Sequence, residues 1–441
     1  MGARPAAPAT HGTPGSATGP EQKRIMTVLV ISQVLSGAGL AAGITVGALL
    51  AEDMLGSTGL AGVPSGLFTA GAALGAMVIG RLSERWGRRP GLTLGHATAA
   101  LGSLGVVMAA ALDTVPLLFL SLFVYGAGTA VNLLARYVGA DLAPPARRAG
   151  AVSTVLLATT FGAVLGPNLV TVTGDVAHAW GIPRLAGPFL LAVVAYAAAA
   201  VVMGAFLRPD PLLRARELAA AEAAERAAEG GADGPAGAGD GAAGERAHVR
   251  GVATGTAVMV LSQLVMIGIM TMTPVHMSAH GHGTQATGLV IALHVAAMFL
   301  PSPLTGRLVD RFGAPRIAAA AGVTLLLAGL LAALAPPHQG ATLAAALVLL
   351  GLGWNFGLVS GTTMITEAVP LATRASTQGL VDVAIAIAGS TGGTTSGLVV
   401  AGSGYPALAA GGGLLALAIV PVVAYSSAGL RSRATLRRTG G

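Results

Sequence analysis

The feature that most constrains this chain is a series of twelve apolar stretches, each about as long as a helix of roughly 20 residues that spans a bilayer. Only 10% of the residues are charged, and the mean hydropathy is +0.75. A water-soluble domain would carry about 25% charged residues. We therefore predict an all-α integral membrane protein with twelve transmembrane helices. The stretches lie at about residues 25–49, 62–80, 91–112, 116–139, 150–173, 185–206, 251–275, 287–306, 316–335, 342–366, 375–401 and 406–428.

The residue types present exclude several classes of enzyme. The chain has no cysteine, which removes disulfides, thiol catalysis and Cys-ligated metal sites. Its one lysine, Lys23, precedes the first apolar stretch, so neither a P-loop for ATP nor a Schiff-base lysine is available. No arrangement of nucleophile, metal ligands or cofactor-binding residues stands out. We expect neither an enzyme nor a bound cofactor or metal.

The apolar stretches fall into two sets of six, separated by a polar interval. Within that interval, residues 211–229 are rich in Ala, Glu and Arg and predict a surface helix, while residues 230–244 are typical of a flexible linker. The predicted organisation is a disordered tail (1–24), a six-helix bundle (25–206), a cytoplasmic linker (207–250), a second six-helix bundle (251–428) and a C-terminal tail (429–441).

Short repeats relate the two sets. VISQVL at 30–35 resembles VLSQLV at 260–265, and GRLSERWGRR at 80–89 resembles GRLVDRFGAP at 306–315. DLAP at 141–144 matches EAVP further along the chain at nearly the same spacing. Such matches indicate an internal duplication, so the two bundles are predicted to be pseudo-symmetric.

The distribution of basic residues predicts the orientation in the membrane. If both termini and the 207–250 interval are cytoplasmic, all of the 25 Lys and Arg residues except Arg184 lie on the cytoplasmic side. This agrees with the excess of Lys and Arg found in cytoplasmic loops. We attribute the basic pI to topology and not to a nucleic-acid partner, and we expect a multi-pass protein of the cell membrane.

The first copy of the long repeat resembles the G-x-L-[AS]-D-R-x-G-R-R loop of the major facilitator superfamily. The resemblance implies that the two halves rock around a central substrate site, that the chain is monomeric, and that these loops lock one conformation. The physical expectation is that Gly80 and Gly306 permit tight turns, and that the acidic residues pair with nearby arginines and favour the N-terminus of the next helix. The alternative is that the arginines only anchor the topology. The motif residues are Gly80, Glu84, Arg85, Gly87 and Arg88, with Gly306, Asp310, Arg311 and Gly313 in the second copy.

A second resemblance concerns the direction of transport. Gly162, Gly166 and Pro167 look like the G-x-x-x-G-P element of proton-driven exporters in this superfamily, which implies a drug or metabolite:proton antiporter. The alternative is a face of packing glycines. The chain departs from the exporter pattern at Leu122, where those proteins usually carry an arginine; Arg136 lies further along the same helix.

Three ionisable residues within apolar stretches are candidates for proton coupling: Asp382, His294 and Arg136. Asp382 lies eight residues beyond Arg374, or about 12 Å along a helix. Ionisable groups at such depth are costly and usually functional. For Asp382 the alternative is a structural ion pair with Arg136, and for His294 a hydrogen-bonded packing role.

Polar side chains in the apolar stretches are the candidate substrate ligands, and interhelical hydrogen bonding is the alternative role for each. They are Gln33, Asn132, Asn168, Gln263, His294 and Asn355. Outside the stretches, His276, His280 and His282 have ligand chemistry for a transition metal, but the intervening glycines favour a solvated loop.

The function predicted from these observations is secondary active transport, with proton-coupled export of small organic molecules or drugs. Substrate, protons and lipid are the expected partners. Import of a metabolite by symport, or a membrane sensor that does not transport, are the alternatives, because a fold does not determine direction.

Overall fold

The computed structural model describes residues 19–55, 62–228, 238–336 and 338–426, and in these ranges the regular structure is entirely helical. One half of the molecule and the helix that follows it comprise α1 Gly19–Leu55, α2 Gly62–Trp86, α3 Arg88–Ala111, α4 Val115–Thr129, α5 Val131–Asp141, α6 Arg148–Asn168, α7 Val170–Ala179, α8 Gly187–Phe206 and α9 Pro211–Ala228. The other half comprises α10 Ala238–Ala279, α11 Thr284–Phe299, α12 Ser302–Phe312, α13 Ala314–Leu334, α14 Gly340–Ala368 and α15 Arg374–Leu417.

These helices make twelve crossings, as the apolar stretches predict. Ten candidate spans are found among the described residues, and α4 with α5 forms one of them. The last candidate, Arg374–Ser426, contains two crossings because the backbone turns at Gly404, where φ is +82°. The pair α6 and α7, separated only by Leu169, supplies the remaining crossing.

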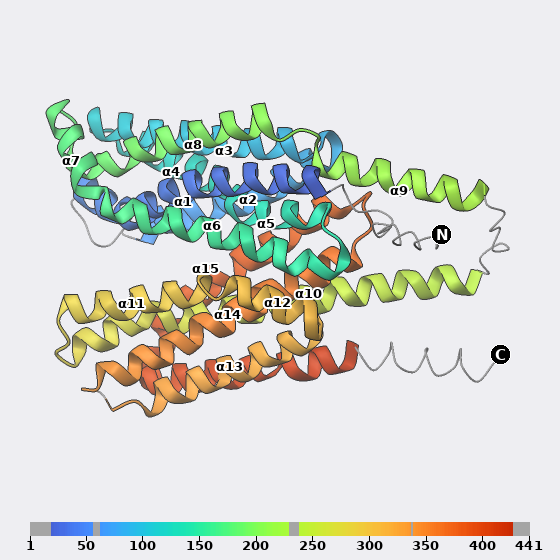
Figure 1. Ribbon diagram of the computed structural model, residues 1–441. Helices are drawn as coiled ribbons and strands as arrows, with labels where there is room; N and C mark the ends of the chain where they lie inside the picture. The colour runs from blue at the N-terminus through green and yellow to red at the C-terminus, as the bar shows by residue number, and fades with distance from the viewer. Residues whose placement is uncertain (1–18, 56–61, 229–237, 337, 427–441) are drawn as a thin grey trace, which may run out of the picture.

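The two halves lie side by side as separate bundles (Figure 1). Lipid offers little hydrophobic driving force between helices, so close approach at small residues becomes important. Gly162 illustrates this: a Cβ atom there would lie 2.1 Å from the carbonyl oxygen of Val34, so α6 packs directly on α1. The glycine of the predicted exporter element therefore has a packing role within the first half.

Two boundaries predicted from the sequence are wrong. Helix α1 begins at Gly19, so the helix includes the last residues of the predicted 1–24 tail; residues 1–18 lie outside the described part. The predicted linker at 230–244 is helical from Ala238 onwards, as the start of α10. Once a helix exists, each added residue gains one backbone hydrogen bond, which favours extension even through a segment that contains three glycines. The predicted surface helix is confirmed as α9, and the C-terminal tail lies outside the described residues.

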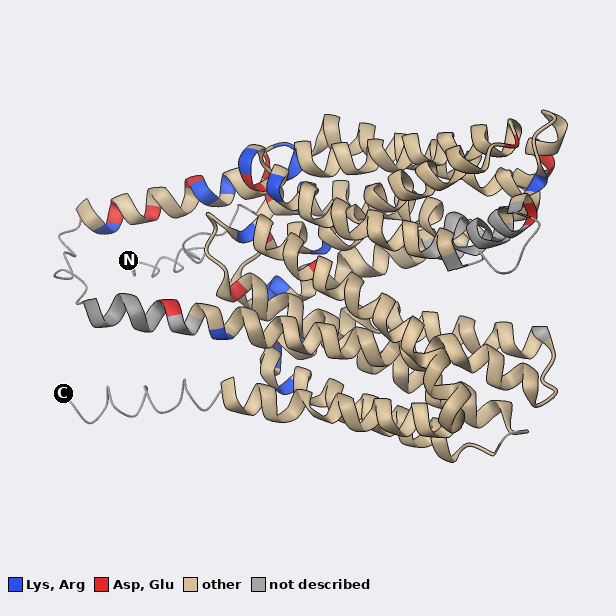
Figure 2. Cartoon of the chain, turned by 180° about the vertical axis from the view of Figure 1, so that it is seen from behind, with Lys and Arg blue, Asp and Glu red and all other residues tan. Residues whose placement is uncertain are grey.

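The charged residues gather at one end of the two bundles (Figure 2). We call this end, where the described chain begins at Gly19 and ends at Ser426 and where α9 lies, the terminal face. At the opposite face, Arg184 pairs with Asp175 in a solvent-exposed ion pair.

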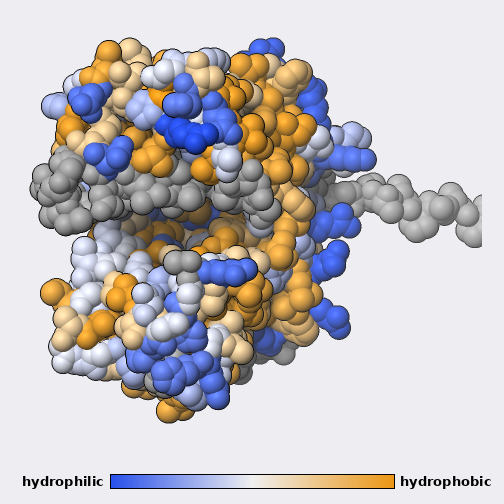
Figure 3. Space-filling model, turned by 90° about the vertical axis from the view of Figure 1, so that its left-hand side faces the viewer, coloured by the Kyte–Doolittle hydropathy of each residue, from blue (hydrophilic) through white to orange (hydrophobic). Residues whose placement is uncertain are grey.

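The two halves touch at the terminal face and separate towards the opposite face. Helix α2 packs on α15 and α6 packs on α12, so each half contributes one helix to each contact. Figure 3 looks onto the opposite face and shows a hollow between the two halves. The structure is therefore closed at the terminal face and open at the opposite one.

Candidate functional site

A fully buried ion pair joins the two halves. Arg136 on α5 donates from Nη2 to Oδ1 of Asp382 on α15 at 2.6 Å, and the two side chains are 0% and 3% exposed. Arg136 also donates from Nε to Thr362 on α14 and from Nη2 to the hydroxyl of Tyr137, both at 3.0 Å. The structure thus joins two of the three predicted coupling residues. Separating the halves here requires this pair to break.

A second buried cluster lies closer to the terminal face, around Asp141 at the end of α5. Its Oδ2 accepts from Nε of Arg88 at 2.8 Å, and its Oδ1 lies 3.8 Å from Nη1 of Arg374. Arg88 also donates to Oε1 of Gln378 at 2.5 Å. Asp141 and Arg88 belong to the first half, whereas Arg374 and Gln378 belong to the second, so this cluster also links the halves.

This cluster was not predicted from the sequence. Arg88 was expected in an interfacial loop, but its side chain is 1% exposed. Asp141 served only as a marker of the duplication. The sequence did contain a signal for this cluster: three apolar stretches have a charged residue at the end that lies on the same side of the membrane. These residues are Arg88, Asp141 and Arg374.

The acidic residues of the two motif copies cap helices of the opposite half. Glu84 accepts from the backbone N–H of Ser376 at 3.0 Å, and from its hydroxyl, at the start of α15. Asp310 accepts from the N–H groups of Ala149 and Gly150, at 3.0 and 2.9 Å, at the start of α6. These carboxylates were predicted to pair with arginines and to favour the N-terminus of the next helix. Both predicted partners are wrong, because the carboxylates accept from helix starts in the opposite half. Each carboxylate accepts hydrogen bonds from N–H groups that have no partner within their own helix. Its negative charge also interacts favourably with the positive end of that helix's dipole.

The motif glycines divide into two roles. A Cβ atom on Gly80 would lie 2.9 Å from the carbonyl oxygen of Ala375, and one on Gly306 would lie 2.7 Å from that of Ala149. These two glycines therefore allow helices of opposite halves to approach, and the prediction that they form tight turns is wrong. The turns belong to Gly87 and Gly313, with φ of +95° and +88°, a region that favours glycine.

Two motif arginines remain at the surface. Arg85 is exposed on α2, and Arg311 lies over the ring of Phe312 at 5.3 Å. Neither forms an ion pair with another described residue.

The capping arrangement leads to a prediction. Glu84→Gln and Asp310→Asn should insert normally but weaken closure at the terminal face, because a neutral amide interacts less strongly with the helix dipole. Distances between spin labels on α9 and on the α12–α13 connection should shift to longer values in both variants. Glu217→Gln, which removes an exposed carboxylate of α9, is the control. Unchanged distances in both variants would eliminate the closing role.

The candidate ligands of the first half are mostly satisfied by neighbours. Gln33 donates to the carbonyl oxygen of Asn132 at 3.0 Å and to the hydroxyl of Thr159 at 2.9 Å. Asn132 donates to the carbonyl oxygen of Thr129 and to the hydroxyl of Tyr196, both at 3.0 Å. Its Oδ1 atom is buried and has no partner among the described residues. The amides thus connect helices, with one acceptor left unused.

The second half shows a similar arrangement. Asn355 is fully buried: it accepts from Thr305 at 2.6 Å and donates to Ser302 and to the Met298 carbonyl oxygen, both at 2.7 Å. His294 contacts the carbonyl oxygen of Leu347 through Nδ1 at 2.7 Å. Its Nε2 atom has no partner among the described residues. His294 is therefore separate from the Arg136–Asp382 pair.

Gln263 has a different environment. It is half-buried and accepts a hydrogen bond from Nε1 of Trp354 at 2.7 Å. Trp354 in turn packs edge-on against Phe299, with ring centroids 5.6 Å apart. An amide beside two aromatic rings provides both polar and flat apolar contacts.

The remaining candidates are less informative. Pro167 and Asn168 end α6, and the structure does not describe their side chains; Gly166 is buried in the same helix.

The predicted histidine loop lies at the opposite face. There His276 stacks on Tyr405, with ring centroids 4.4 Å apart, and its ring centroid lies 4.3 Å from that of His280. Among the described residues, no group of three His, Asp or Glu side chains is placed to hold a metal ion, and this includes His282.

Comparisons with known proteins agree with this architecture. The family model of the Major Facilitator Superfamily matches residues 29–393 and 255–438. An uncharacterised MFS-type transporter of Bacillus subtilis, YdeG, is 54% identical, over 92% of each chain. The riboflavin transporter RfnT of Brucella anthropi is 30% identical, over 82% of this chain and 85% of its own.

Solved structures show the same fold at low sequence identity. The human organic anion transporter MFSD10 superposes with a TM-score of 0.71 at 17% identity, over 92% of this chain and 100% of that one. The proton:xylose symporter XylE superposes with a TM-score of 0.69, also at 17% identity, over 92% and 95%. With twelve crossings, a duplicated motif and two halves that meet at one face, the chain belongs to the major facilitator superfamily and is a secondary transporter of small molecules.

Proposed function

We propose that the protein is a monomeric, proton-coupled exporter of small organic molecules in the cell membrane, with the terminal face in the cytoplasm. The observation that carries the proposal is the buried Arg136–Asp382 pair between the halves. The orientation is supported by the basic residues gathered at the terminal face (Figure 2).

The ion pair supplies a physical route for coupling. Opening the terminal face would leave Arg136 and Asp382 apart within the membrane, and an unpaired buried charge is strongly unfavourable. Protonation of Asp382 removes its charge and weakens its attraction to Arg136. Proton uptake at Asp382 would therefore favour separation of the halves, and proton release would favour closure. Exchange of proton for substrate further requires that the substrate binds only while Asp382 is deprotonated, and this condition is part of the proposal.

The substrate is inferred to contain a planar aromatic ring system with hydrogen-bonding groups. In the second half, Gln263 and Phe299 are half-buried and flank the ring of Trp354, which is 5% exposed. The relative RfnT is named a riboflavin transporter, and riboflavin combines a flat heteroaromatic ring with hydroxyl groups. Riboflavin is therefore the first probe, followed by a panel of other planar heteroaromatic compounds.

Transport in proteoliposomes tests the proposal. Vesicles without ATP and with an acidic lumen should concentrate the substrate inside, because an antiporter accumulates substrate in the compartment that is richer in protons. An ionophore that collapses the pH gradient should abolish this accumulation. The outcome does not depend on how the protein is oriented in the vesicles, because the gradients alone set the final distribution.

The same measurement distinguishes the alternative of symport, which would concentrate substrate in the alkaline compartment. Equilibration without accumulation in either gradient would contradict proton coupling altogether. A requirement for ATP by the purified chain would contradict secondary transport.

A further inference from the structure

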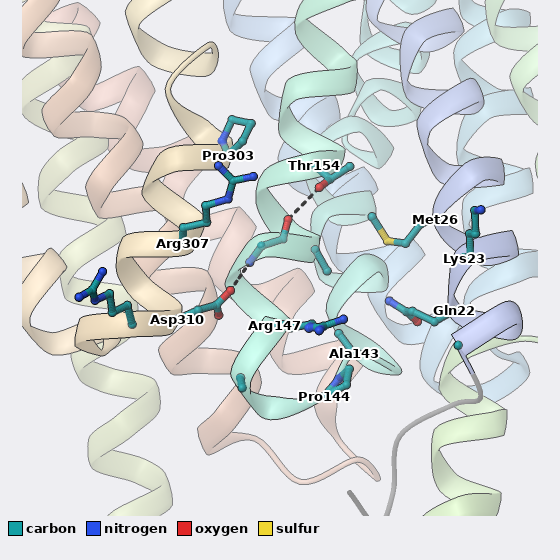
Figure 4. A pocket seen from close by; sticks show the side chains of 15 residues that line it. Gln22, Lys23, Met26, Ala143, Pro144, Arg147, Thr154, Pro303, Arg307 and Asp310 are labelled. Atoms are coloured by element: carbon teal, nitrogen blue, oxygen red, sulfur yellow. Dashed lines mark hydrogen bonds between the residues drawn. The ribbon is translucent and has the colours of Figure 1, made fainter. Parts of the chain in front are cut away.

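A cavity of about 830 Å³ lies at the terminal face, apart from the Arg136–Asp382 pair (Figure 4). Its walls come from the start of α1, the connection between α5 and α6, the first turns of α6, and α12. The first three belong to one half and α12 to the other. Anything bound in this cavity therefore contacts both halves in their closed arrangement.

The cavity is positively charged. Lys23, Arg147, Arg307 and Arg311 line it with exposed side chains, and none of them forms an ion pair with another described residue. Asp310 is the one carboxylate among the lining residues, and the backbone N–H groups of Ala149 and Gly150 already occupy it. The cations are therefore available to an anion from outside the protein.

Apolar surface continues from the cations towards the middle of the membrane. Leu304 is 59% exposed and lies one helical turn before Arg307, on the same face of α12. An anionic group at the cations with an apolar chain along Leu304 matches the shape of a phospholipid.

The cavity wall also carries an unused hydrogen-bond acceptor. Gln22 donates from Nε2 to the carbonyl oxygen of Gly139 at 3.2 Å, while its Oε1 atom is buried without a partner among the described residues. Because this oxygen is buried, a ligand hydroxyl reaches it only if the Gln22 side chain rotates, and recognition of the anion rests on the four cations.

We propose that the cavity binds the phosphate-bearing headgroup of an anionic phospholipid of the cytoplasmic leaflet, and that this lipid stabilises the state closed at the terminal face. Basic pockets between transmembrane helices on the cytoplasmic side are suited to anionic headgroups. The inference rests on the orientation in the proposed function but not on the substrate or on proton coupling. Free phosphate carries the same anionic group as the lipid headgroup, so the test must distinguish binding of the lipid from binding of phosphate.

The test compares thermal unfolding in nanodiscs of phosphatidylcholine with unfolding in nanodiscs that also contain phosphatidylglycerol. A ligand that binds the folded protein raises its Tm as the ligand concentration rises. We expect Tm to rise with the phosphatidylglycerol fraction and the rise to shrink at high salt, because salt screens exposed charges. The rise should be lost in Lys23→Gln/Arg147→Gln/Arg307→Gln.

The matched control is Arg208→Gln/Arg226→Gln/Arg250→Gln, which removes three exposed cations outside the cavity. It should keep the rise. If the first triple variant does not fold, Arg307→Gln should reduce the rise and Arg307→Lys should retain most of it. Inorganic phosphate added to phosphatidylcholine nanodiscs separates the sources: a rise in Tm with phosphate alone that matches the effect of phosphatidylglycerol would overturn the lipid assignment.

Two other results would overturn the proposal: no rise with phosphatidylglycerol in the unmodified protein, or an equal loss in both triple variants. Because unfolding is measured without substrate or pH gradient, a failure here leaves the transport proposal intact. A failure of the transport test likewise leaves the lipid measurement interpretable.

Discussion

Asp382→Asn protein should lose gradient-driven accumulation of substrate almost completely while it retains substrate exchange between vesicles and medium at equal pH. Asparagine is neutral and cannot exchange a proton, so the variant resembles a permanently protonated carrier. Exchange requires the substrate to cross in both directions but no net proton movement. Counterflow of labelled substrate, beside accumulation in an imposed pH gradient, measures the two properties on the same vesicles.

The control for this variant is Asp113→Asn, which neutralises an exposed carboxylate between α3 and α4. It should leave both accumulation and exchange unchanged. Full gradient-driven accumulation by a stable Asp382→Asn protein would rule out the coupling role.

The same substitution also tests how much the pair contributes to stability. Removal of one member of a buried ion pair typically costs about 3–5 kcal/mol, whereas removal of both can be nearly neutral. Arg136→Gln/Asp382→Asn should therefore recover part of the stability that Asp382→Asn loses. Recovery of stability without recovery of accumulation would assign both a structural and a coupling role to the pair. Accumulation in the double variant would contradict the coupling role.

Asp141→Asn is expected to have the largest effect on stability. Asp141 contacts two buried guanidinium groups, those of Arg88 and Arg374, as no other carboxylate in the described part of the chain does. Without it, two like charges remain close together in a water-poor site. We expect a loss of about 3–5 kcal/mol in unfolding free energy. The closed state should also weaken, because the cluster includes residues of both halves.

The matched control is Asp175→Asn, which breaks the exposed pair with Arg184 at the opposite face. Exposed pairs contribute only about 0–1 kcal/mol. Thermal or denaturant unfolding of the two variants in the same detergent measures the contrast. Equal losses in both variants would show that the Asp141 cluster does not hold the halves together.

The predicted motif residues show where sequence reasoning succeeded and where it did not. The repeat aligns Gly87 with Gly313, and both adopt positive φ, but the turns had been predicted at Gly80 and Gly306. It also identified Glu84 and Asp310 but not their partners, the N–H groups of Ser376 and Ala149–Gly150. Backbone N–H groups carry no signature in the sequence. Which helix end faces a given carboxylate depends on how the two halves dock.

The duplication itself was misleading at one position. The repeat aligns Asp141 with Glu367, yet Asp141 is buried between arginines and Glu367 is exposed. The second motif copy has Ala314 where the first has Arg88, so one cation of an equivalent cluster is missing; the counterpart of Arg374 is Arg148, which interacts electrostatically with Glu367. Similar sequences thus produce different electrostatic environments in the two halves.

The sequence by itself determined the membrane class, the twelve crossings, the duplication and the family. These follow from local properties, because a bilayer forces each long apolar segment to satisfy its own backbone as a helix, whatever its neighbours are. The tertiary structure decided which buried charges meet. It contains the Arg136–Asp382 pair, which the sequence offered only as an alternative, and it brings Asp141 to Arg88 and Arg374, which the sequence did not predict. The Arg136–Asp382 and Asp141–Arg374 pairs join residues of opposite halves, so these two pairs exist only where the halves are closed. Their geometry depends on docking, and hydropathy and local spacing carry no information about it.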